Sequence, residues 1–236
     1  MEIHQVKTRY SNTYVIEQSD NILVVDVASR CDGFVLKYIS ETMGRSIFDV
    51  KLVVCTHDDP DHIGGVTALA RSCHAMAAIP FASKRPHIKL FQSPLGPIVR
   101  IATTTREAFR KRSRQMYMSS ERNARYQHVH NHHVETEDAK QFLLPKFRLT
   151  HGNELKGFPG WLVIHTPGHS PDSLCFFHEP TRSLLTGDTI LGSGKAGRVV
   201  FPAIYDSPVE MRRTIRKLRK LKATTIYPGH GQFFTG

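Results

Sequence analysis

The chain has 236 residues, which suits one large domain or two small ones, and 40% of them are hydrophobic, enough for a sizeable core. It contains no run of about 18 apolar residues, and residues 1–5 lack the basic-then-apolar pattern of a signal peptide, so we expect no membrane span and a cytoplasmic location. No CxxC pair occurs among Cys31, Cys55, Cys73 and Cys175, which favours reduced thiols over disulfides or a metal role.

The formal net charge of +11 is distributed unevenly along the chain. Residues 81–150 contain 14 Lys and Arg against 5 Asp and Glu, a balance of +9, whereas the remaining residues contain 18 against 16, a balance of +2. A positive segment attracts anionic substrates, nucleic acid or a membrane surface. A solvated face that keeps the protein in solution explains the same charge, and both interpretations stay open.

The first part of the chain reads as strands followed by helices. Two β-rich runs cover residues 13–17 and 21–26, and a turn at 18–20 joins them. We expect a helix over residues 33–43, ended by Gly44, and then a buried strand over 52–55. A second helix is expected over residues 63–72.

The last part of the chain repeats this order of elements. Strands are expected over residues 161–165, 173–177, 183–186 and 224–227. A basic helix is expected over 208–221, because its apolar residues recur every three or four positions. Two similar halves of alternating strands and helices predict sheets that are covered by helices.

Residues 83–146 lie between the two halves and do not fit this pattern. Within them, residues 103–127 are expected to be helical with a strongly basic surface. Four histidines follow in a polar run: His128, His130, His132 and His133. Such a cluster can bind metal, although histidines at this density more often form a surface tract.

The segment THDDPDHIGG at residues 56–65 places metal-binding side chains directly after the buried strand. His57, Asp59, Asp61 and His62 stand within six positions. Imidazole nitrogen and carboxylate oxygen suit Zn²⁺, and a mixed set also admits Fe or Mn. As an alternative, Asp61 could cap a helix that starts near Ile63, but capping explains only one carboxylate.

Three single residues, His169, Asp188 and His230, occur in similar loops later in the chain. Each follows an apolar strand and lies in a glycine-containing loop, where the backbone can closely approach a small site. Taken alone, each is more often a surface, turn or capping residue. Together with the early loop, they predict one metal centre.

Four motifs together resemble those of the metallo-β-lactamase-fold superfamily of hydrolases. They are THDDPDHIGG at 56–65, HTPGHSPDS at 165–173, LLTGDTI at 184–190 and YPGHG at 227–231, in the same order and over essentially the full length. The resemblance implies an α/β fold: a four-layer αββα sandwich with the metals at one edge of the two sheets. We therefore expect a single domain over 1–236, with a helical insert at about 83–146 that covers this edge.

The resemblance also implies two divalent metal ions and a bridging hydroxide. The first ion would be held by His57, Asp59 and His169, and the second by Asp61, His62 and His230. Asp188 would bridge both ions. Asp61 and Asp188 are accordingly expected to take part in catalysis.

One position departs from the usual motif of this superfamily. Asp59 stands where a histidine is common, which adds one negative charge and hardens the ligand set. We still expect zinc, but the additional carboxylate makes iron or manganese a stronger alternative than in the usual motif. Flavodiiron oxygen reductases also carry an acidic residue here, but they usually have an additional flavin domain for which this chain is too short.

The resemblance implies a hydrolase in which the bridging hydroxide attacks an ester, thioester or lactone carbonyl of a small anionic substrate. The motifs are most similar to the glyoxalase II and acyl-homoserine lactonase branches. Against a lactonase, no tyrosine follows Asp188 within a few residues. Against glyoxalase II, Asp59 replaces a histidine and the C-terminal helical extension is missing.

Other residues are expected to support the centre or contact the substrate. Asp26, together with Thr56 or Ser170, is a candidate for orienting the imidazoles, although Asp26 could simply cap a strand end. For substrate binding we select three residues: Lys195, Arg198 and Tyr205. Lys195 and Arg198 belong to a glycine-rich basic loop that could hold an anion but could also be only mobile. Three tyrosines are candidate proton donors to the leaving group: Tyr205, Tyr117 and Tyr126.

Three alternative functions remain open. A phosphodiesterase or nuclease could use the basic insert to bind phosphate, with Arg110, Lys111, Arg112, Arg114, Arg122 and Arg125 as its cations. Sparse aromatic residues between these charges argue against stacking on a single strand. A non-enzymatic binding or signalling protein and a mononuclear iron enzyme are the others. As partners we expect a small-molecule substrate and no membrane, with nucleic acid not favoured and a homodimer left open.

Overall fold

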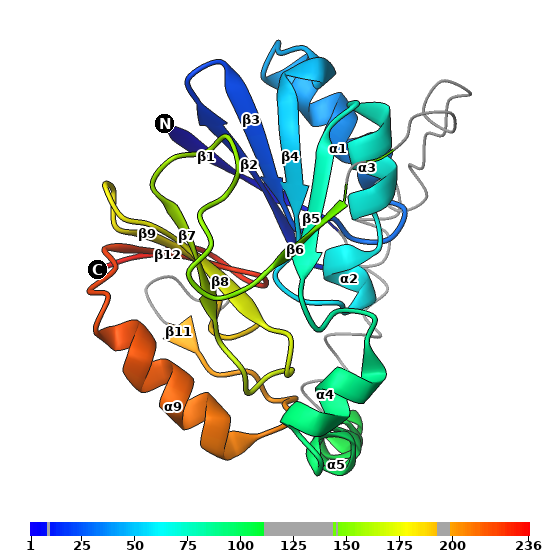
Figure 1. Cartoon of the computed structure of the whole chain (residues 1–236), viewed down its shortest axis with the longest axis vertical. Coiled ribbons are helices and arrows are strands. Elements are labelled where there is room, and N and C mark those ends of the chain that lie inside the picture. Colours follow the sequence, from blue (N-terminus) through cyan, green and yellow to red (C-terminus); the bar gives the residue numbers. More distant parts are fainter. Residues whose placement is uncertain (9, 111–143, 145, 193–198) are drawn as a thin grey trace.

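The computed structural model describes residues 1–8, 10–110, 144, 146–192 and 199–236. Two β-sheets lie face to face, and helices cover the outer face of each sheet (Figure 1). This arrangement is the αββα sandwich that the sequence predicts.

The first sheet has six strands in the order of the chain, β1-β2-β3-β4-β5-β6. Strands β1 to β3 pair antiparallel, and β3 to β6 pair parallel. Its last strand follows the insert, so the insert interrupts this sheet between β5 and β6. The strands are β1 (Glu2–Lys7), β2 (Asn12–Gln18), β3 (Asn21–Val25), β4 (Val50–Val54), β5 (Met76–Pro80) and β6 (Lys146–Leu149).

The second sheet has five strands in the order β13-β12-β9-β8-β7, and β10 pairs with β11 in a separate two-stranded sheet. Strand β12 runs parallel to β9, while the other pairs are antiparallel. The strands are β7 (Trp161–His165), β8 (Leu174–His178), β9 (Ser183–Gly187), β10 (Leu191–Gly192), β11 (Val199–Val200), β12 (Thr225–Pro228) and β13 (Phe234–Thr235).

The helices form the outer layers and one end of the sandwich. Helix α1 (Asp32–Lys37) continues as a π-helical turn over Tyr38–Thr42, and a 3₁₀ turn covers Ile47–Asp49. The remaining helices are α2 (Pro60–Ile63), α3 (Val66–Ser72), α4 (Pro86–Gln92), α5 (Gly96–Phe109) and α9 (Pro208–Arg219). None of the helices in the described ranges combines the length and the apolar character needed to cross a bilayer.

Strand β3 shows how the layers are held together. Val24 packs into the cluster between the first sheet and helices α1 and α3, whereas Leu23 and Val25 belong to the cluster between the two sheets. Successive side chains of a strand point to opposite faces, so a continuous apolar run fits a strand buried on both sides. Trp161 and Phe176 contribute to the same inter-sheet cluster from the second sheet.

Helix α9 covers the outer face of the second sheet. Its Leu218 joins a cluster with Ile164 and Cys175 from that sheet. Half of its twelve residues are charged and none of these is buried, and its last turn is basic. The prediction of an amphipathic basic helix is therefore correct, with its end at Arg219 rather than Leu221.

The helix expected over 63–72 is wrong in its start and its continuity. Helix α2 begins at Pro60, and the glycines at 64 and 65 separate it from α3. A Cβ atom on Gly64 would lie 1.9 Å from Ser29 Oγ and 2.4 Å from the carbonyl oxygen of Pro60. The loop after β3 therefore packs directly on this glycine, an approach that any side chain would block.

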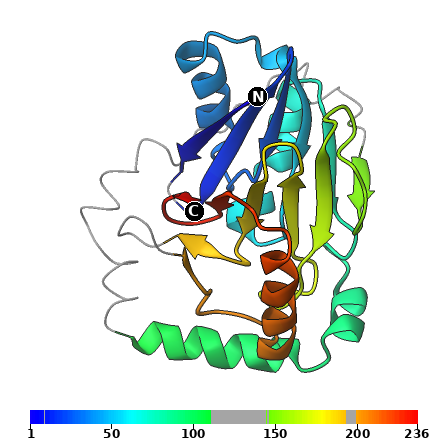
Figure 2. The ribbon, with the colours of Figure 1, turned by 90° about the vertical axis from the view of Figure 1, so that its left-hand side faces the viewer.

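The described part of the insert lies at one end of the sandwich. Helices α4 and α5 sit at the end toward which β3 and β4 point (Figure 1), and α5 runs across that end beside α9 (Figure 2). The helix expected over 103–127 starts earlier, at Gly96. Its later part and the histidine tract at 128–133 lie outside the described residues.

Candidate metal centre

Four loops bring the seven predicted metal-binding side chains together. The loop and helix after β4 carry His57, Asp59, Asp61 and His62; the turn between β7 and β8 carries His169. Asp188 directly follows β9, and His230 follows β12. Segments that are 173 positions apart in the sequence, at His57 and His230, thus meet at the same edge of the sandwich.

The first group consists of His57, Asp59 and His169. The Nε2 atoms of both histidines lie 3.4 Å from Asp59 Oδ2. The ligand atoms of all three residues lie within 4.8 Å of one another. Two imidazoles and a carboxylate at this separation can hold one divalent cation.

The second group consists of Asp61, His62 and His230. His230 Nε2 lies 3.4 Å from Asp61 Oδ2, and His62 Nε2 lies 3.7 Å from the same oxygen. These ligand atoms also lie within 4.8 Å of one another. This group can hold a second cation.

Asp188 lies between the two groups. Its Oδ2 is 3.3 Å from His230 Nε2 and 3.8 Å from His169 Nε2, and its Oδ1 is 3.4 Å from His62 Nε2. One carboxylate therefore faces a histidine of the first group and both histidines of the second. This is the position that a bridging ligand requires.

Unpartnered polar atoms test whether cations fit this centre. His57 Nε2, His62 Nε2 and Asp188 Oδ1 are buried and have no hydrogen-bond partner among the described residues. A buried polar atom without a partner costs free energy, and such atoms call for an explanation. Cations bound by these atoms would satisfy them, so the donor set fits the expected metals.

Asp26 and Thr56 orient two of the imidazoles. His62 Nδ1 donates to Asp26 Oδ2 at 2.9 Å, and Thr56 donates from its backbone nitrogen to Asp26 Oδ1 at 2.7 Å. The Thr56 hydroxyl donates to Asp26 Oδ2 at 2.9 Å and accepts from His57 Nδ1 at 3.0 Å. Both rings therefore present Nε2 to the centre, which confirms the roles expected of Asp26 and Thr56.

The other two imidazoles are positioned through the backbone. His169 Nδ1 donates to the carbonyl oxygen of Ile204 at 2.9 Å. The turn that carries His230 is held by Asn12, whose side chain donates to the carbonyl oxygens of Pro228 and Gly231 at 2.8 and 3.0 Å. The sequence offered no signal for Asn12, which stands 218 positions before His230.

Ser170, a candidate for orienting an imidazole, contacts a carboxylate instead. Its hydroxyl donates to Asp172 Oδ1 at 2.8 Å rather than reaching an imidazole. Asp172 Oδ2 accepts from the backbone nitrogen of Asp58 at 3.0 Å, and Asp172 Oδ1 lies 2.8 Å from Lys89 Nζ. Lys89 also pairs with the Asp58 carboxylate. Asp172 and Lys89 thus hold the early loop between its first two ligand positions.

The cap interpretation of Asp61 is wrong. Helix α2 begins at Pro60 with Asp59 as its N-cap residue, and the Asp59 side chain makes no capping hydrogen bond. Asp61 lies within the first turn and turns its carboxylate toward His62 and His230. Both carboxylates are thus directed to the centre instead of the helix end.

Arg100 of α5 is a contact that the sequence did not reveal. Its Nη2 lies 2.5 Å from Asp59 Oδ2, and its Nη1 lies 3.2 Å from Asp206 Oδ1. The same Nη1 donates to the carbonyl oxygen of His169 at 3.2 Å. The described helix of the insert therefore touches the centre through Arg100.

Opposite charges shift the pKa values of the centre in opposite directions. Burial alone would raise the pKa of Asp59, but hydrogen bonds from His169 and His57 and the charge of Arg100 bring it below its ordinary value. Burial alone would lower the pKa of His230, but the charge and hydrogen bond of Asp188 raise it to about 10. Cation binding must therefore displace a proton from His230 at neutral pH.

The predicted substrate residues are placed only in part. Lys195 and Arg198 lie outside the described residues, as do Tyr117 and Tyr126. Tyr205 stands between Ile204, which binds His169, and Asp206, which binds Arg100. The described contacts of Tyr205 are backbone contacts with the Thr103 hydroxyl.

A family model described as the metallo-beta-lactamase superfamily matches residues 6–230. The chain belongs to this superfamily. The match spans all seven clustered residues.

Curated relatives within the superfamily match over shorter segments. "Probable metallo-hydrolase YqjP" from Bacillus subtilis is 30% identical over 89 residues, which cover 36% of this chain and 28% of the relative. An "atrochrysone carboxyl ACP thioesterase" from Aspergillus fumigatus is 37% identical over 69 residues, which cover 29% of this chain and 20% of the relative. The chain thus spans less than a third of either relative.

Solved structures of the superfamily share the fold over the full chain. The structure of TTHA1623, described as a di-iron-bound form, has a TM-score of 0.57 and 20% sequence identity. The alignment covers 100% of this chain and 94% of TTHA1623. At this identity the likeness establishes the fold.

Proposed function

We propose that the protein is a dinuclear metal-dependent hydrolase that attacks the carbonyl carbon of an ester, thioester or lactone and breaks its acyl C–O or C–S bond. The observation that carries this proposal is the convergence of seven imidazoles and carboxylates, three of whose buried atoms lack a partner among the described residues. The first group would hold one cation, the second group would hold the other, and Asp188 would contact both.

The bound cations would supply a hydroxide at neutral pH by lowering the pKa of a water molecule. The chain's own residues supply the geometry around it. Asp26 and Thr56 hold the rings of His62 and His57 so that each turns Nε2 toward the site. Asp61 remains 30% exposed, against 27% for Asp59 and 13% for Asp188, so it is the carboxylate of the centre with the most access to solvent or substrate.

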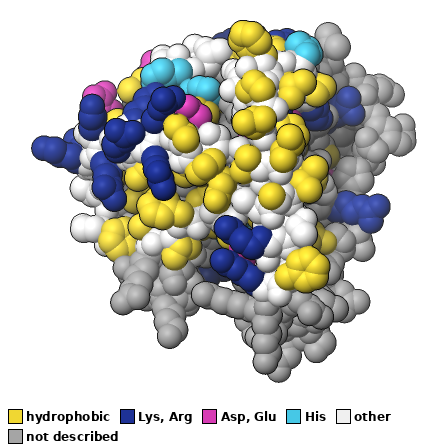
Figure 3. Space-filling model, turned by 90° about the horizontal axis from the view of Figure 1, so that it is seen from below, with side chains coloured by type: hydrophobic (Ala, Val, Ile, Leu, Met, Phe, Trp, Pro, Cys, Tyr) yellow, Lys and Arg dark blue, Asp and Glu magenta, His cyan; other side chains and the backbone are white. Residues whose placement is uncertain are grey.

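Several features favour a thioester or ester with an apolar acyl group. Exposed apolar side chains line α4 and α5, including Phe91 at 87% and Ile101 at 68% exposure. The end of the molecule that bears these helices shows apolar side chains across its middle, with a dense group of Lys and Arg on one side and a few more at the centre and on the other side (Figure 3). The named thioesterase relative supports this class, within the short segment it shares.

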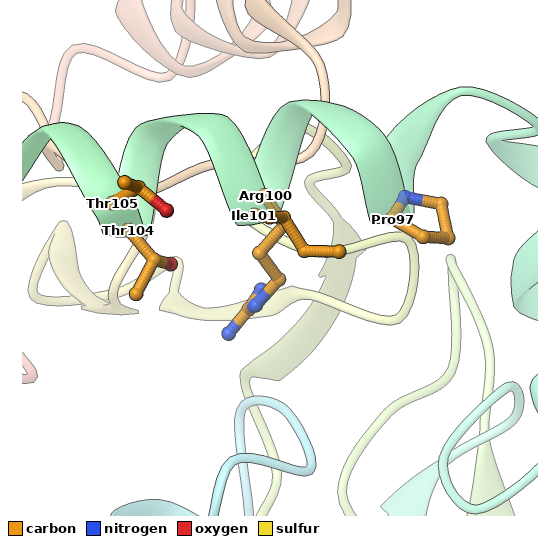
Figure 4. A pocket seen from close by; sticks show the side chains of 5 residues that line it. All are labelled: Pro97, Arg100, Ile101, Thr104 and Thr105. Carbon is orange, nitrogen blue, oxygen red and sulfur yellow. The ribbon is translucent and has the colours of Figure 1, made fainter.

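The apolar surface contains a groove on α5. It has a volume of about 390 Å³, within the range of small-molecule sites. Its described lining is one helical face, formed by Pro97, Arg100, Ile101, Thr104 and Thr105 (Figure 4). Since the Arg100 guanidinium reaches Asp59, the groove adjoins the centre, and we expect it to accept the acyl group.

The phosphodiesterase alternative finds less support in the described part of the insert. Four of the described cations already have anionic partners. Lys89 pairs with Asp58 and Asp172, and Arg100 pairs with Asp59 and Asp206. Arg106 and Arg110 both pair with Glu107. Binding of a phosphate backbone needs cations free to replace counterions. The many cations of residues 111–143 lie outside the described residues and leave this alternative to experiment.

A substrate panel tests the proposed chemistry. It comprises acetyl and hexanoyl p-nitrophenyl esters, the matching thioesters, a lactone and bis-p-nitrophenyl phosphate. We expect hydrolysis of the esters and thioesters to dominate. Turnover of the phosphate diester alone would overturn the proposal in favour of the phosphodiesterase.

The acyl groove is tested by a pair of matched variants. Ile101→Asp alters the groove, whereas Ile98→Asp changes a neighbour of similar exposure, 66%, that is not part of the described lining. We expect Ile101→Asp to lose most of the preference for hexanoyl over acetyl substrates, since each buried methylene contributes about 0.8 kcal/mol. Equal preference in both variants would place the acyl group elsewhere.

Metal identity is also part of the proposal. Zinc suits a site of imidazoles and carboxylates, and the Asp59 carboxylate additionally favours iron or manganese. The di-iron form of TTHA1623 shows that this fold can hold iron. Elemental analysis of protein purified without chelator should give about two equivalents in total, and complete absence of metal from active protein would refute a metal mechanism.

A further inference from the structure

Arg100 brings a permanent positive charge to one side of the centre. It leaves α5 on the groove side (Figure 4), and its Nη2 lies 2.5 Å from Asp59 Oδ2. The other terminal nitrogen, Nη1, binds Asp206 Oδ1 and the carbonyl oxygen of His169, both at 3.2 Å. Three acceptors therefore hold the guanidinium in place, and arginine keeps its charge at every accessible pH.

Arg100 shares one oxygen atom with the first group. Asp59 Oδ2 accepts from Arg100 and is also the oxygen that lies 3.4 Å from both His57 Nε2 and His169 Nε2. A cation held by the first group would therefore use an oxygen whose negative charge is already offset. Repulsion between the guanidinium and a divalent cation at this separation further weakens binding.

The second group has no such offset. Within the described ranges, Asp61 and Asp188 pair with histidines, and neither pairs with Lys or Arg. Asp188 would face both cations, so each site has one further carboxylate: Asp59 in the first group and Asp61 in the second. Of these two carboxylates, Asp59 is the one that pairs with an arginine. Asp206 restores one negative charge near Arg100 but is not among the described groups whose atoms could share a cation.

We propose that Arg100 makes the first group the weaker of the two cation sites, so that the second group fills first and the insert sets the occupancy of the first. This inference rests on the two-cation site proposed above. It also gives the unusual Asp59 a partner. A carboxylate in place of an imidazole adds one negative charge, and Arg100 returns one positive charge to the same group.

Metal titration tests the proposal without a measurement of activity. Metal-free protein is titrated with Zn²⁺ alone against a chromophoric chelator, and the two binding steps are resolved. The second binding step is the filling of the first group. We expect Arg100→Met to lower the dissociation constant of this step about tenfold, the size of effect that one charged contact has, and to leave the first step nearly unchanged. Arg100→Lys keeps the charge and should stay close to the wild type.

Arg106→Met is the matched control. Arg106 lies on the same helix and pairs with Glu107 at 3.3 Å, and it donates to the carbonyl oxygen of Ala203. Its described contacts include none of the seven clustered residues. We expect Arg106→Met to change neither binding step.

A double-mutant comparison separates charge from a structural role. Asp59→His restores the usual imidazole but leaves Arg100 without its partner at the first group. We expect Asp59→His to bind the second equivalent more weakly than the double variant Asp59→His with Arg100→Met. If Arg100 only supported the fold, its removal would weaken binding in both backgrounds.

The outcomes distinguish this inference from the proposed function. Two equivalents in the wild type with no tightening in Arg100→Met would overturn the role of Arg100 and leave the dinuclear site standing. A single equivalent in every variant would overturn both. One equivalent in the wild type and two in Arg100→Met would support the inference in its strongest form.

Discussion

His62 Nδ1 lies 2.9 Å from Asp26 Oδ2, and the opposite nitrogen of the same ring, Nε2, lies 3.4 Å from Asp188 Oδ1. One imidazole thus connects a buried carboxylate at the end of β3 with the carboxylate that lies between the two groups. Asp26 adopts a φ of 60°, a left-handed conformation that aspartate tolerates better than most residues. The first sheet thereby fixes the ring before any cation arrives.

Asp26→Asn should weaken metal binding by about 10- to 100-fold, the usual effect of losing a partner that orients a ligating histidine. The amide keeps the shape of the side chain but loses the charge that raises the pKa of His62 against the effect of burial. Chelator competition measures the change. Asp49→Asn, which affects a pair with Arg45 far from the centre, serves as the control. An unchanged affinity in Asp26→Asn would show that backbone packing alone orients His62.

Asp188→Ala should lose most bound metal and most hydrolytic activity. Asp188 is the one residue in the described set whose carboxylate faces histidines of both groups, so its removal affects both cations. Elemental analysis after gel filtration and the ester panel measure the two losses, and circular dichroism checks the fold. Full activity after this change would refute the bridging role.

The metal-free protein should become less stable as the pH rises from about 6.5 to about 10. The pKa of His230 is raised from 6.5 to about 10 by the charge and hydrogen bond of Asp188, which outweigh burial. A group with a raised pKa stabilises the folded state fully below its unfolded pKa, and this stabilisation is lost as pH passes the folded pKa. Urea unfolding of chelator-treated protein at pH 6.5 and 9.5 measures the loss.

His230→Gln is the control for this pH dependence. It removes the titrating group, so the difference in unfolding free energy between pH 6.5 and 9.5 should shrink. It should not vanish, because the pKa of His62 is also raised by Asp26 and Asp188 against the effect of burial. The same pH dependence in His230→Gln as in the wild type would assign it to other groups.

The residues of the centre could be predicted from the sequence because their signal is local. His57, Asp59, Asp61 and His62 occur in one short run, and the later three each follow an apolar strand in a glycine-containing loop. The signal for the strands over 161–165 and 183–186 is also local, because a short continuous apolar run fits a strand buried on both faces. Strands β1 and β6 were missed because most of their residues are exposed or half-buried.

Asp26 and Thr56 were predicted to support the centre, but three other supporting residues were not, because their partners are distant in the sequence. Arg100 stands in a basic segment where its charge resembles that of many neighbours, and only folding brings it to Asp59. Asn12 begins an ordinary strand, and its contact with the turn of His230 depends on the two sheets meeting. Asp172 lies in the motif at 165–173, but nothing in that motif distinguishes it from Ser170, which we predicted as the orienting residue. In the structure, Ser170 donates to Asp172.

Gly229→Ala should damage the metal centre more than it destabilises the fold. A Cβ atom at this position would lie 2.6 Å from Asp188 Oδ1, 2.7 Å from His62 Cε1 and 2.9 Å from the backbone carbonyl carbon of Gly187. The two side chains of the centre supply the nearest atoms and must shift most. The backbone of Gly229 is not in the left-handed region, and alanine adds no conformational strain there.

Gly157→Ala provides the opposite case. Gly157 has a φ of 82° and open space where a Cβ would stand, so alanine should lower stability through strain and leave the centre untouched. Zinc affinity by chelator competition and the melting temperature of metal-free protein are measured for both variants. We expect Gly229→Ala to show the larger loss of affinity and Gly157→Ala the larger fall in melting temperature. If Gly229→Ala binds zinc as the wild type does, the centre can accommodate a displaced Asp188, and the tight packing between the turn of His230 and Asp188 is not required for binding.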